Sequence, residues 1–154
     1  GPLGTYEGGR EKSPAAICRK VALAEDGGEI EVWGDGNQTR SYCYIDDCVE
    51  GIDRLMRSDH HDPINLGTDR LIPVNELVDI VSAAAGKTLR KRYDLAKPQG
   101  VRGRNSDNAH LRAVLGWEPC VPLEEGMART YRWIEGQLRA QGRIAARARD
   151  AAVA

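Results

Sequence analysis

Segments with strand and helical periodicity alternate along the whole chain, and glycine or proline separates them. Residues 29–33 alternate charged and apolar side chains, as a half-buried strand does, whereas 74–85 repeats apolar residues at helical spacing and ends before Gly86. This alternation predicts an α/β fold of mixed short strands and helices. Helices are predicted over 13–25, from Asp46 or Asp47 to 58, over 74–85, from Ser106 or Asp107 to 116 and from 123 to 138, and strands over 29–33, 41–44, 64–66 and 90–93.

Turn and cap residues indicate where several of these elements begin. Ser13 is expected to be the N-cap of the first helix, with Pro14 at the first helical position. The glycine-rich turn 34–37 predicts that the first two strands form a hairpin-like pair. Pro73 stands where a hydroxyl-bearing cap usually starts the next helix, which is unfavourable for the stability of that helix.

The chain has 154 residues, a length at which a single domain is the default. No apolar stretch approaches the ~18 residues that a membrane helix needs, which excludes a membrane protein. We expect a globular region over 1–142 and a frayed or disordered Ala- and Arg-rich tail over 143–154. Because it begins with Gly1 and shows no leader pattern, we expect it to be part of a longer protein, with a tag-cleavage scar over 1–4 as the alternative.

The four cysteines form no CxxC motif and no regular framework, which favours free thiols in a reducing, cytoplasmic compartment. A zinc site would have to use Cys43, Cys48, His60 and His61. That spacing fits no closed tetrahedral pattern, so no metal site is predicted.

The net charge of −1 conceals two halves of opposite sign. Residues 1–85 hold 8 basic and 16 acidic side chains, whereas 86–154 hold 14 basic and 7 acidic ones. The basic residues are not interleaved with aromatic residues, and several lie in a glycine-rich loop, so a compact anion is favoured over nucleic acid. An RNA-binding module remains the weaker alternative.

Three short strings are rich in glycine and charge and therefore poor for packing. In 8–12, two glycines precede Arg10, Glu11 and Lys12 just before a helix, where a lysine can exchange protons with a substrate, although a solvated loop has the same composition. In 34–40, Gln38 and Arg40 share one face of an extended strand, and their amide and guanidinium suit a sugar hydroxyl beside a phosphate.

The alternative for Arg40 is an ion pair with Asp46 or Asp47. The third string, 100–108, places Arg102 and Arg104 before helix-capping residues, which predicts an anion site of guanidinium groups and free backbone N–H groups. A basic turn without a ligand is its alternative.

Taken in order, these strings and the segment 45–51 resemble the C-terminal half of the extended short-chain dehydrogenase/reductase family of NAD-dependent nucleotide-sugar epimerases and dehydratases. The resemblance covers about residues 1–138. The strings 8–12 and 101–108 are most similar to the members that epimerise GDP-mannose at C3 and C5. The resemblance implies that the chain is the substrate-binding part of a Rossmann-type fold whose NAD-binding half is missing.

The resemblance implies that NAD, held by the missing half, oxidises the sugar at C4 while acid/base residues exchange protons at C5 and C3. It assigns an acid/base role to Lys12, and homodimerisation to the full-length protein. Contacts with a nucleotide sugar of the GDP-mannose type are implied for Glu11, Ser13, Lys20, Gln38, Thr39, Arg40 and Arg104.

The chain departs from the family pattern in what it lacks. It has no glycine-rich NAD fingerprint, no Tyr-x-x-x-Lys pair and no segment that would carry the acid/base cysteine of the family. We therefore expect the chain to bind substrate without turning it over. The alternatives are another nucleotide-sugar epimerase or dehydratase, or a non-catalytic remnant that binds a nucleotide or another protein.

Overall fold

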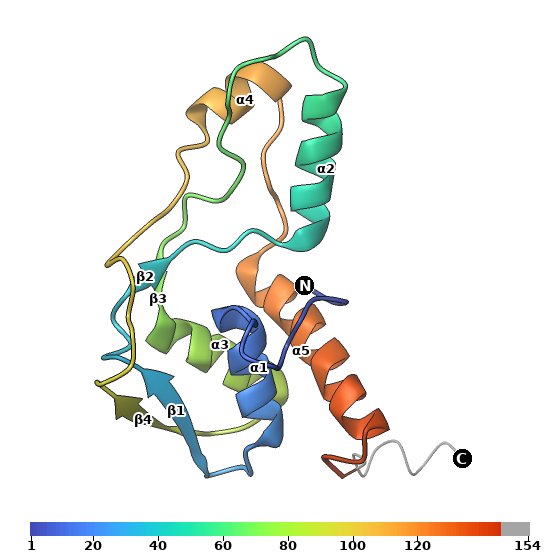
Figure 1. The fold of residues 1–154 in the computed structure, drawn as a ribbon. Helices are drawn as coiled ribbons and strands as arrows, with labels where there is room; N and C mark the ends of the chain where they lie inside the picture. Colours follow the sequence, from blue (N-terminus) through green and yellow to red (C-terminus); the bar gives the residue numbers. More distant parts are fainter. Residues whose placement is uncertain (146–154) are drawn as a thin grey trace.

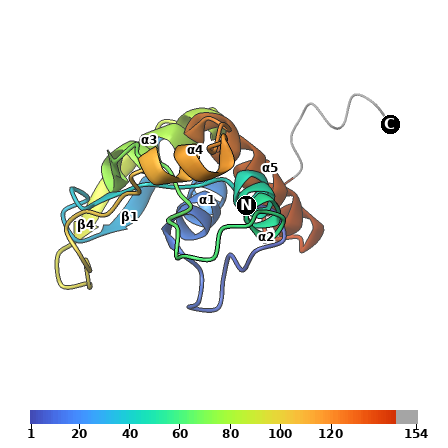
Figure 2. The same ribbon diagram turned by 90° about the horizontal axis from the view of Figure 1, so that it is seen from above.

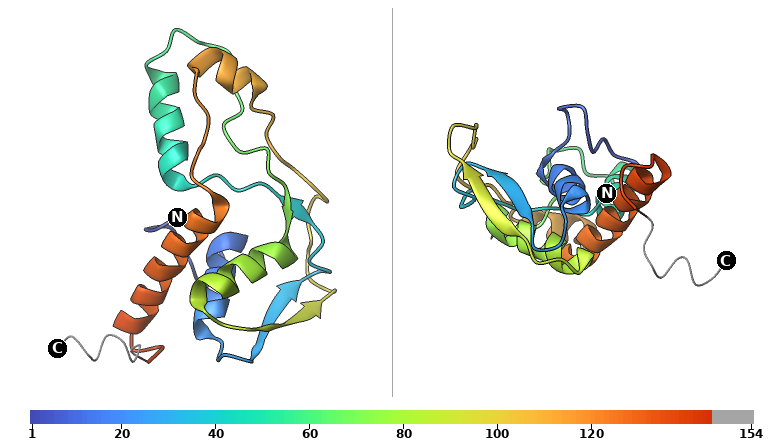
Figure 3. Two further views of the ribbon diagram at one scale, coloured as in Figure 1. Left: turned by 180° about the vertical axis from the view of Figure 1, so that it is seen from behind. Right: turned by 90° about the horizontal axis from the view of Figure 1, so that it is seen from below.

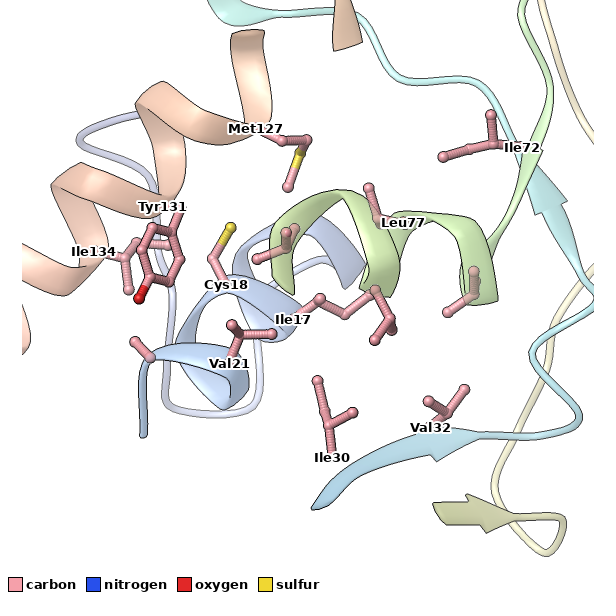
Figure 4. Packing of buried hydrophobic residues seen from close by; sticks show 14 of the residues in the cluster. Ile17, Cys18, Val21, Ile30, Val32, Ile72, Leu77, Met127, Tyr131 and Ile134 are labelled. Atoms are coloured by element: carbon pink, nitrogen blue, oxygen red, sulfur yellow. The ribbon is translucent and has the colours of Figure 1, made fainter. Parts of the chain in front are cut away.

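Three helices form the centre of the fold because each presents an apolar stripe to the other two. The computed structural model describes residues 1–145. Helices α1 (Ser13–Leu23), α3 (Val74–Ala85) and α5 (Leu123–Ala140) pack against one another, as Figure 1 shows. Figure 4 shows their side chains meeting in the shared core, among them Cys18, Val21, Leu77, Tyr131 and Ile134, each no more than 1% exposed.

A two-stranded parallel sheet covers the helical core on the side away from α5 (Figures 2 and 3). Strand β1 (Glu29–Trp33) pairs with β4 (Arg90–Asp94), with Glu29 opposite Arg90. Ile30 and Val32 enter the core, so Glu31 and Trp33 lie on the other face. The predicted strands 29–33 and 90–93 are confirmed, and so is the predicted α/β fold.

The predicted hairpin is wrong. After β1 the chain turns away from the sheet, and β2 (Thr39–Arg40) pairs instead with β3 (Ile72–Pro73) in an antiparallel manner. The cause lies at the start of α3, where the backbone N–H groups of Val74 and Asn75 donate to the carbonyl groups of Gln38 and Gly36. The turn therefore caps α3, and this explains how Pro73 can precede a stable helix without a hydroxyl cap.

Helix α1 and helix α4 (Ala109–Leu115) begin one or more residues from where their predicted caps placed them. Lys12 is the N-cap position of α1, and Ser13 is its first residue, with Oγ 3.3 Å from the Tyr42 hydroxyl. Asn108 is the N-cap position of α4, although Asp107 accepts a hydrogen bond from the N–H of Ala109, as a capping side chain would.

Helix α2 (Ile45–Met56) follows Tyr44 at its N-cap position, so neither Asp46 nor Asp47 caps it. Asp47 is buried and accepts hydrogen bonds from the backbone N–H groups of Cys120 (3.1 Å) and Val121 (2.8 Å), which ties α2 to the segment before α5. α2 and α4 lie apart from the three-helix core (Figure 1).

The segment 64–66 forms no strand, contrary to the prediction. Both strand pairings of the described residues lie elsewhere, and the backbone of 64–66 makes no hydrogen bond with residues 1–145. A strand needs a neighbouring strand, so strand-like composition alone does not produce one.

The two halves of opposite charge pair with each other across the fold. Carboxylates of the acidic half meet cations of the basic half in ion pairs that include Arg90–Glu29, Lys91–Asp79, Arg92–Glu31, Arg102–Asp35 and Arg143–Glu7. Much of the basic charge is thereby used within the chain, which disfavours a polyanion as its partner.

In the part of the chain that the structure describes, every helix is too short or too polar to cross a bilayer. Residues 146–154, which make up most of the predicted tail, lie outside the described residues.

Replacing Asp47 tests its role as the acceptor that joins α2 to the segment before α5. Asp47→Ala leaves two backbone N–H groups without their acceptor, and we expect it to lower the free energy of unfolding by about 2 kcal/mol in urea denaturation. The matched control is Asp46→Ala, because Asp46 is exposed and forms a long ion pair with Arg129 at 3.7 Å; its expected cost is below about 0.5 kcal/mol. Equal costs for the two variants would contradict this role.

Candidate functional site

A cavity of about 320 Å³ opens between the start of α1, strand β1, strand β2 and the loop after β4. Its lining combines the apolar Ile17, Val32 and Val74 with a larger set of polar and aromatic side chains. Those side chains are Glu11, Ser13, Arg19, Lys20, Glu31, Trp33, Gln38, Arg40 and Gln99. A concave site of this size with convergent polar groups is typical of small-molecule binding.

Glu11 stands at the entrance of α1 with one of its carboxylate oxygens already engaged. Oε1 accepts a hydrogen bond from Arg19 at 3.1 Å, while Oε2 is buried and has no partner among the described residues. Hydrogen bonds, first with its own backbone N–H and then with Arg19 and the N–H of Gly9, hold the pKa of Glu11 below its ordinary value. Glu11 is therefore an anionic acceptor with one oxygen free for a hydroxyl group.

Glu31 fixes the opposite wall of the cavity. It accepts hydrogen bonds from Lys20 Nζ (3.4 Å), Trp33 Nε1 (3.0 Å) and Arg92 (2.9 Å), and the bond from Trp33 is the main reason that its pKa is lowered. The Lys20 ammonium also lies 5.7 Å from the centre of the Trp33 ring. Lys20 is thus held in place, with its charge matched by Glu31.

Gln38 and Arg40 line the cavity from the polypeptide around β2. The Gln38 amide donates to the Trp33 carbonyl at 2.9 Å, which leaves its buried Oε1 without a partner. Arg40 donates to the carbonyl groups of Thr39 (2.6 Å) and Gln99 (3.4 Å) but forms no ion pair with any described carboxylate. The alternative pairing with Asp46 or Asp47 is wrong, because Asp47 binds backbone N–H groups and Asp46 binds Arg129.

Lys12, Thr39 and Arg104 do not line the cavity. Lys12 is exposed beside its mouth, directly after Glu11. Thr39 and Arg104 belong to two segments that run side by side, since the Thr39 N–H donates to the Arg102 carbonyl (2.9 Å) and the Ser41 N–H to the Arg104 carbonyl (3.2 Å).

This close approach of the arginine loop to β2 depends on Gly103. A Cβ atom at that position would lie 2.8 Å from Thr39 Oγ1, so a larger residue would push the loop away. The backbone pairing with the polypeptide around β2 therefore positions Arg102 and Arg104, and the anion site expected there stays a prediction. Arg102 is directed to Asp35, at 3.4 Å, whereas the exposed Arg104 side chain has no partner among the described residues.

The cysteines do not contribute reactive groups to the cavity. All four are free, and burial raises the pKa of Cys18 to about 12 and that of Cys43 to about 11, which keeps both protonated near neutral pH. Among residues 1–145 no three metal-ligating side chains gather at one point, so Cys43, Cys48, His60 and His61 do not form a zinc site.

The described residues do not fit a dinucleotide cofactor. Such a site needs a glycine-rich turn between a parallel strand and a following helix, whose N-terminus faces the pyrophosphate. Here the turn after β1 leads into β2, and that after β4 leads into the arginine loop. No cofactor chemistry is therefore assigned to these residues.

Several lining residues were not predicted from the sequence. Arg19, Glu31 and Trp33 belong to the lining, as do Pro98 and Gln99 of the loop after β4. The alternation in 29–33 contained the signal for Glu31 and Trp33, because both had to lie on the face turned away from the core. Nothing local indicated Gln99, since the loop reaches the cavity through long-range folding.

The arrangement of elements is that of the short-chain dehydrogenase/reductase-type enzymes that act on nucleotide sugars. A crystal structure of Thermotoga maritima UDP-glucose 4-epimerase with UDP-glucose superimposes with a TM-score of 0.81 and 29% identity, over 90% of this chain and 43% of that chain. The Bacillus cereus UDP-glucuronic acid 4-epimerase in complex with UDP-glucuronic acid and NAD has the same fold, with a TM-score of 0.74, 21% identity and coverage of 82% and 40%.

The family is defined by a second comparison. Residues 4–130 match the model of the GDP-mannose 4,6 dehydratase family, and the chain belongs to this family. Among its relatives, the GDP-mannose 3,5-epimerase of Arabidopsis thaliana is 48% identical over 138 residues, which are 90% of this chain and 36% of that protein. The chain thus spans little more than a third of the length of this relative.

The lowered pKa of Glu11 predicts how stability depends on pH. A carboxylate whose folded-state pKa is depressed stabilises the fold above its unfolded pKa of about 4.3, and this contribution is lost as the pH falls through the folded value. We expect Glu11→Gln to flatten the fall of the melting temperature below pH 4.3 relative to the wild type. Glu25→Gln, at an exposed carboxylate without an ion pair, should leave the curve unchanged; identical curves for Glu11→Gln and wild type would contradict the prediction.

Proposed function

We propose that the cavity binds the diphosphate and sugar of a nucleotide sugar of the GDP-mannose type. The observation that carries this proposal is Arg40, which faces the cavity without a carboxylate partner while Arg19 and Lys20 are neutralised by Glu11 and Glu31. The uncompensated guanidinium of Arg40 suits a dianionic pyrophosphate. The exposed Arg104 belongs to the loop that adjoins β2.

The sugar would be recognised by acceptors that the fold leaves without partners. Gln38 Oε1 and Glu11 Oε2 are both buried and unpartnered, and hydroxyl groups donate readily to such oxygens. A buried acceptor that gains a donor only when ligand binds rejects ligands without that hydroxyl. Ser13, whose hydroxyl lies beside that of Tyr42, completes the polar side of the cavity.

Lys12 is proposed as one member of an acid/base pair that exchanges protons at C5 and C3 of the sugar. Its exposed ammonium follows Glu11 and precedes the first turn of α1, next to the cavity. In the longer protein, NAD would supply the oxidation at C4, bound by a part of the relatives outside the matched region. The complete enzyme would be a cytoplasmic homodimer, and the 154-residue chain would bind substrate without epimerising it.

The alternative is another nucleotide-sugar epimerase or a dehydratase of the same family. The match to the 4,6-dehydratase model and the fold of the UDP-glucose 4-epimerase favour it, whereas the 48% identity to a GDP-mannose 3,5-epimerase favours the first proposal. Competition between GDP-mannose and UDP-glucose for the chain separates the two.

Calorimetric titration of the purified chain with GDP-mannose tests the role of Arg40. Loss of one charge-assisted interaction with phosphate should raise the Kd about tenfold in Arg40→Gln. The control is Arg90→Gln, because Arg90 is exposed at the far end of the β1–β4 pair and contacts Glu29. Equal affinities for Arg40→Gln and wild type, or tighter binding of UDP-glucose than of GDP-mannose, would overturn the proposal.

Incubation of the chain with GDP-mannose and NAD tests whether it is active alone. We expect no GDP-L-galactose or GDP-L-gulose by chromatography, because the described residues do not form a dinucleotide site. Product formation that Lys12→Met abolishes would show that the chain is a complete enzyme.

A further inference from the structure

Arg19 of helix α1 joins the two ends of the segment 7–10, which we call the glycine loop. Its Nε donates to the Tyr6 carbonyl at 2.9 Å, directly before the loop. Its Nη2 donates to Glu11 Oε1 at 3.1 Å, directly after the loop. Both bonds come from one planar guanidinium group, whose N–H groups keep a fixed mutual geometry. A single side chain of α1 therefore fixes both ends of the glycine loop.

The glycine loop itself has few restraints within the described chain. Gly8 and Gly9 have φ angles of 89° and 81°, and a Cβ atom at either would meet no atom within 4 Å. Among residues 1–145, no hydrogen bond between backbone groups involves 7–10, and the ion pair of Glu7 with Arg143 restrains only the start of the loop. The loop projects from the fold beside α1 (Figure 2), so its order depends on how its ends are held.

The contact between Arg19 and Glu11 is mostly shielded from water. Their side chains are 23% and 11% exposed, so solvent screens this ion pair less than the surface pairs of the fold. The backbone N–H of Glu11, and after it Arg19, lower the pKa of the Glu11 carboxyl group. Arg19 therefore holds Glu11 both in place and in its anionic form.

We propose that Arg19 is a positioning residue of the sugar site, which acts by fixing Glu11 in the wall of the cavity and Lys12 at its mouth. This inference rests on the proposed function, since it takes Glu11 and Lys12 to act on the sugar. Arg19 occupies Oε1 of Glu11, so the buried Oε2 is the oxygen left for a sugar hydroxyl. Lys12 follows directly, at the N-cap position of α1, so the same bonds fix the point at which its side chain leaves the backbone.

The charges of the cavity favour this role of Arg19 over a direct contact with phosphate. Glu11 already matches the charge of Arg19, whereas Arg40 has no carboxylate partner among the described residues. A phosphate drawn to Arg19 would have to compete with Glu11 for the same guanidinium. A lysine could not replace Arg19 fully, because its donors share one nitrogen and do not form a planar fork.

The first experiment measures the order of the glycine loop by NMR relaxation in the chain without ligand. Arg19→Gln should lower the backbone order parameters of 7–12 from about 0.85 to below about 0.6, and Arg19→Lys should lower them less. The matched control is Arg139→Gln. Arg139 also donates to a carboxylate (Glu135, 3.0 Å) and to a carbonyl group (Ala145, 2.8 Å), with exposures of 20% and 11% in its ion pair. This control should leave the loop unchanged, and an equally ordered loop in Arg19→Gln would overturn the proposal.

The second experiment follows the carboxyl carbon of Glu11 by NMR as the pH is lowered. Arg19→Gln should raise the midpoint of this titration, because the charge and the donor beside Oε1 are lost. Arg19→Lys keeps the charge and should keep most of the lowered midpoint, and Arg139→Gln should keep all of it. The other charged groups that line the cavity or flank Glu11 in sequence are the same in every variant: Arg10, Lys12, Lys20, Glu31 and Arg40. An unchanged midpoint in Arg19→Gln would contradict the role, since a general loss of stability does not move it.

The third experiment is a double-mutant cycle, read by calorimetric titration with GDP-mannose. Arg19→Gln and Glu11→Gln should each raise the Kd about tenfold, and the double variant should also raise it about tenfold, because Arg19 acts through Glu11. A rise of about a hundredfold in the double variant would show that Arg19 contacts the ligand itself and would overturn the positioning role. Arg139→Gln should bind as the wild type does.

Failure of the proposed function is recognised separately from failure of this inference. If the wild type does not bind GDP-mannose, while Arg19→Gln still loosens the loop and raises the Glu11 midpoint, the proposed substrate is refuted and the positioning of Glu11 by Arg19 stands. If GDP-mannose binds, but Arg19→Gln leaves the loop, the midpoint and the Kd unchanged, the positioning role is refuted and the proposed substrate stands.

Discussion

The packing of α1 against α3 and α5 is the constraint on which both the core and the cavity depend. Cys18 and Val21 are fully buried between these helices, while the intervening Arg19 and Lys20 lie on the flank that faces the cavity. A rotation of α1 that exposed the first pair would carry the second pair out of the site. The geometry of the cavity is therefore stabilised by burial of apolar area at roughly 25 cal/mol per Å² and not by its own polar contacts.

Within that frame, charge pairing decides which cation is left for a ligand. The acidic and basic halves of the sequence neutralise each other where they meet, as Glu31 does for Lys20 and Arg92. Most of these pairs are exposed and contribute little to stability individually. Their effect is to leave Arg40 as a cation of the cavity that no described carboxylate compensates. Arg40 is therefore the group at which an anion would bind.

Local patterns in the sequence predicted elements well and their partners poorly. Alternation in 29–33 and helical spacing in 74–85 depend on neighbouring residues, so both were correct. The hairpin was wrong because the turn 34–37 is held by the N–H groups at the start of α3, a contact between residues far apart in sequence. Asp47 was predicted as a helix cap, but its carboxylate accepts hydrogen bonds from the N–H groups of Cys120 and Val121. These residues lie far from Asp47 in sequence, so no local rule reveals such an acceptor. In the site, periodicity indicates which side chains of α1 and β1 face the cavity. It does not indicate that the arginine loop pairs with β2, because that contact joins residues far apart in sequence.

The predicted strand 64–66 and the exposed apolar side chains Val49, Ile52 and Met56 of α2 have one physical explanation. Both are local signals that only a neighbouring surface can satisfy, and residues 1–145 provide none. Lys12 shows the same dependence on a neighbouring surface. It lies exposed at the mouth of the cavity, whereas the acid/base role proposed for it requires that water be excluded from the proton that is transferred.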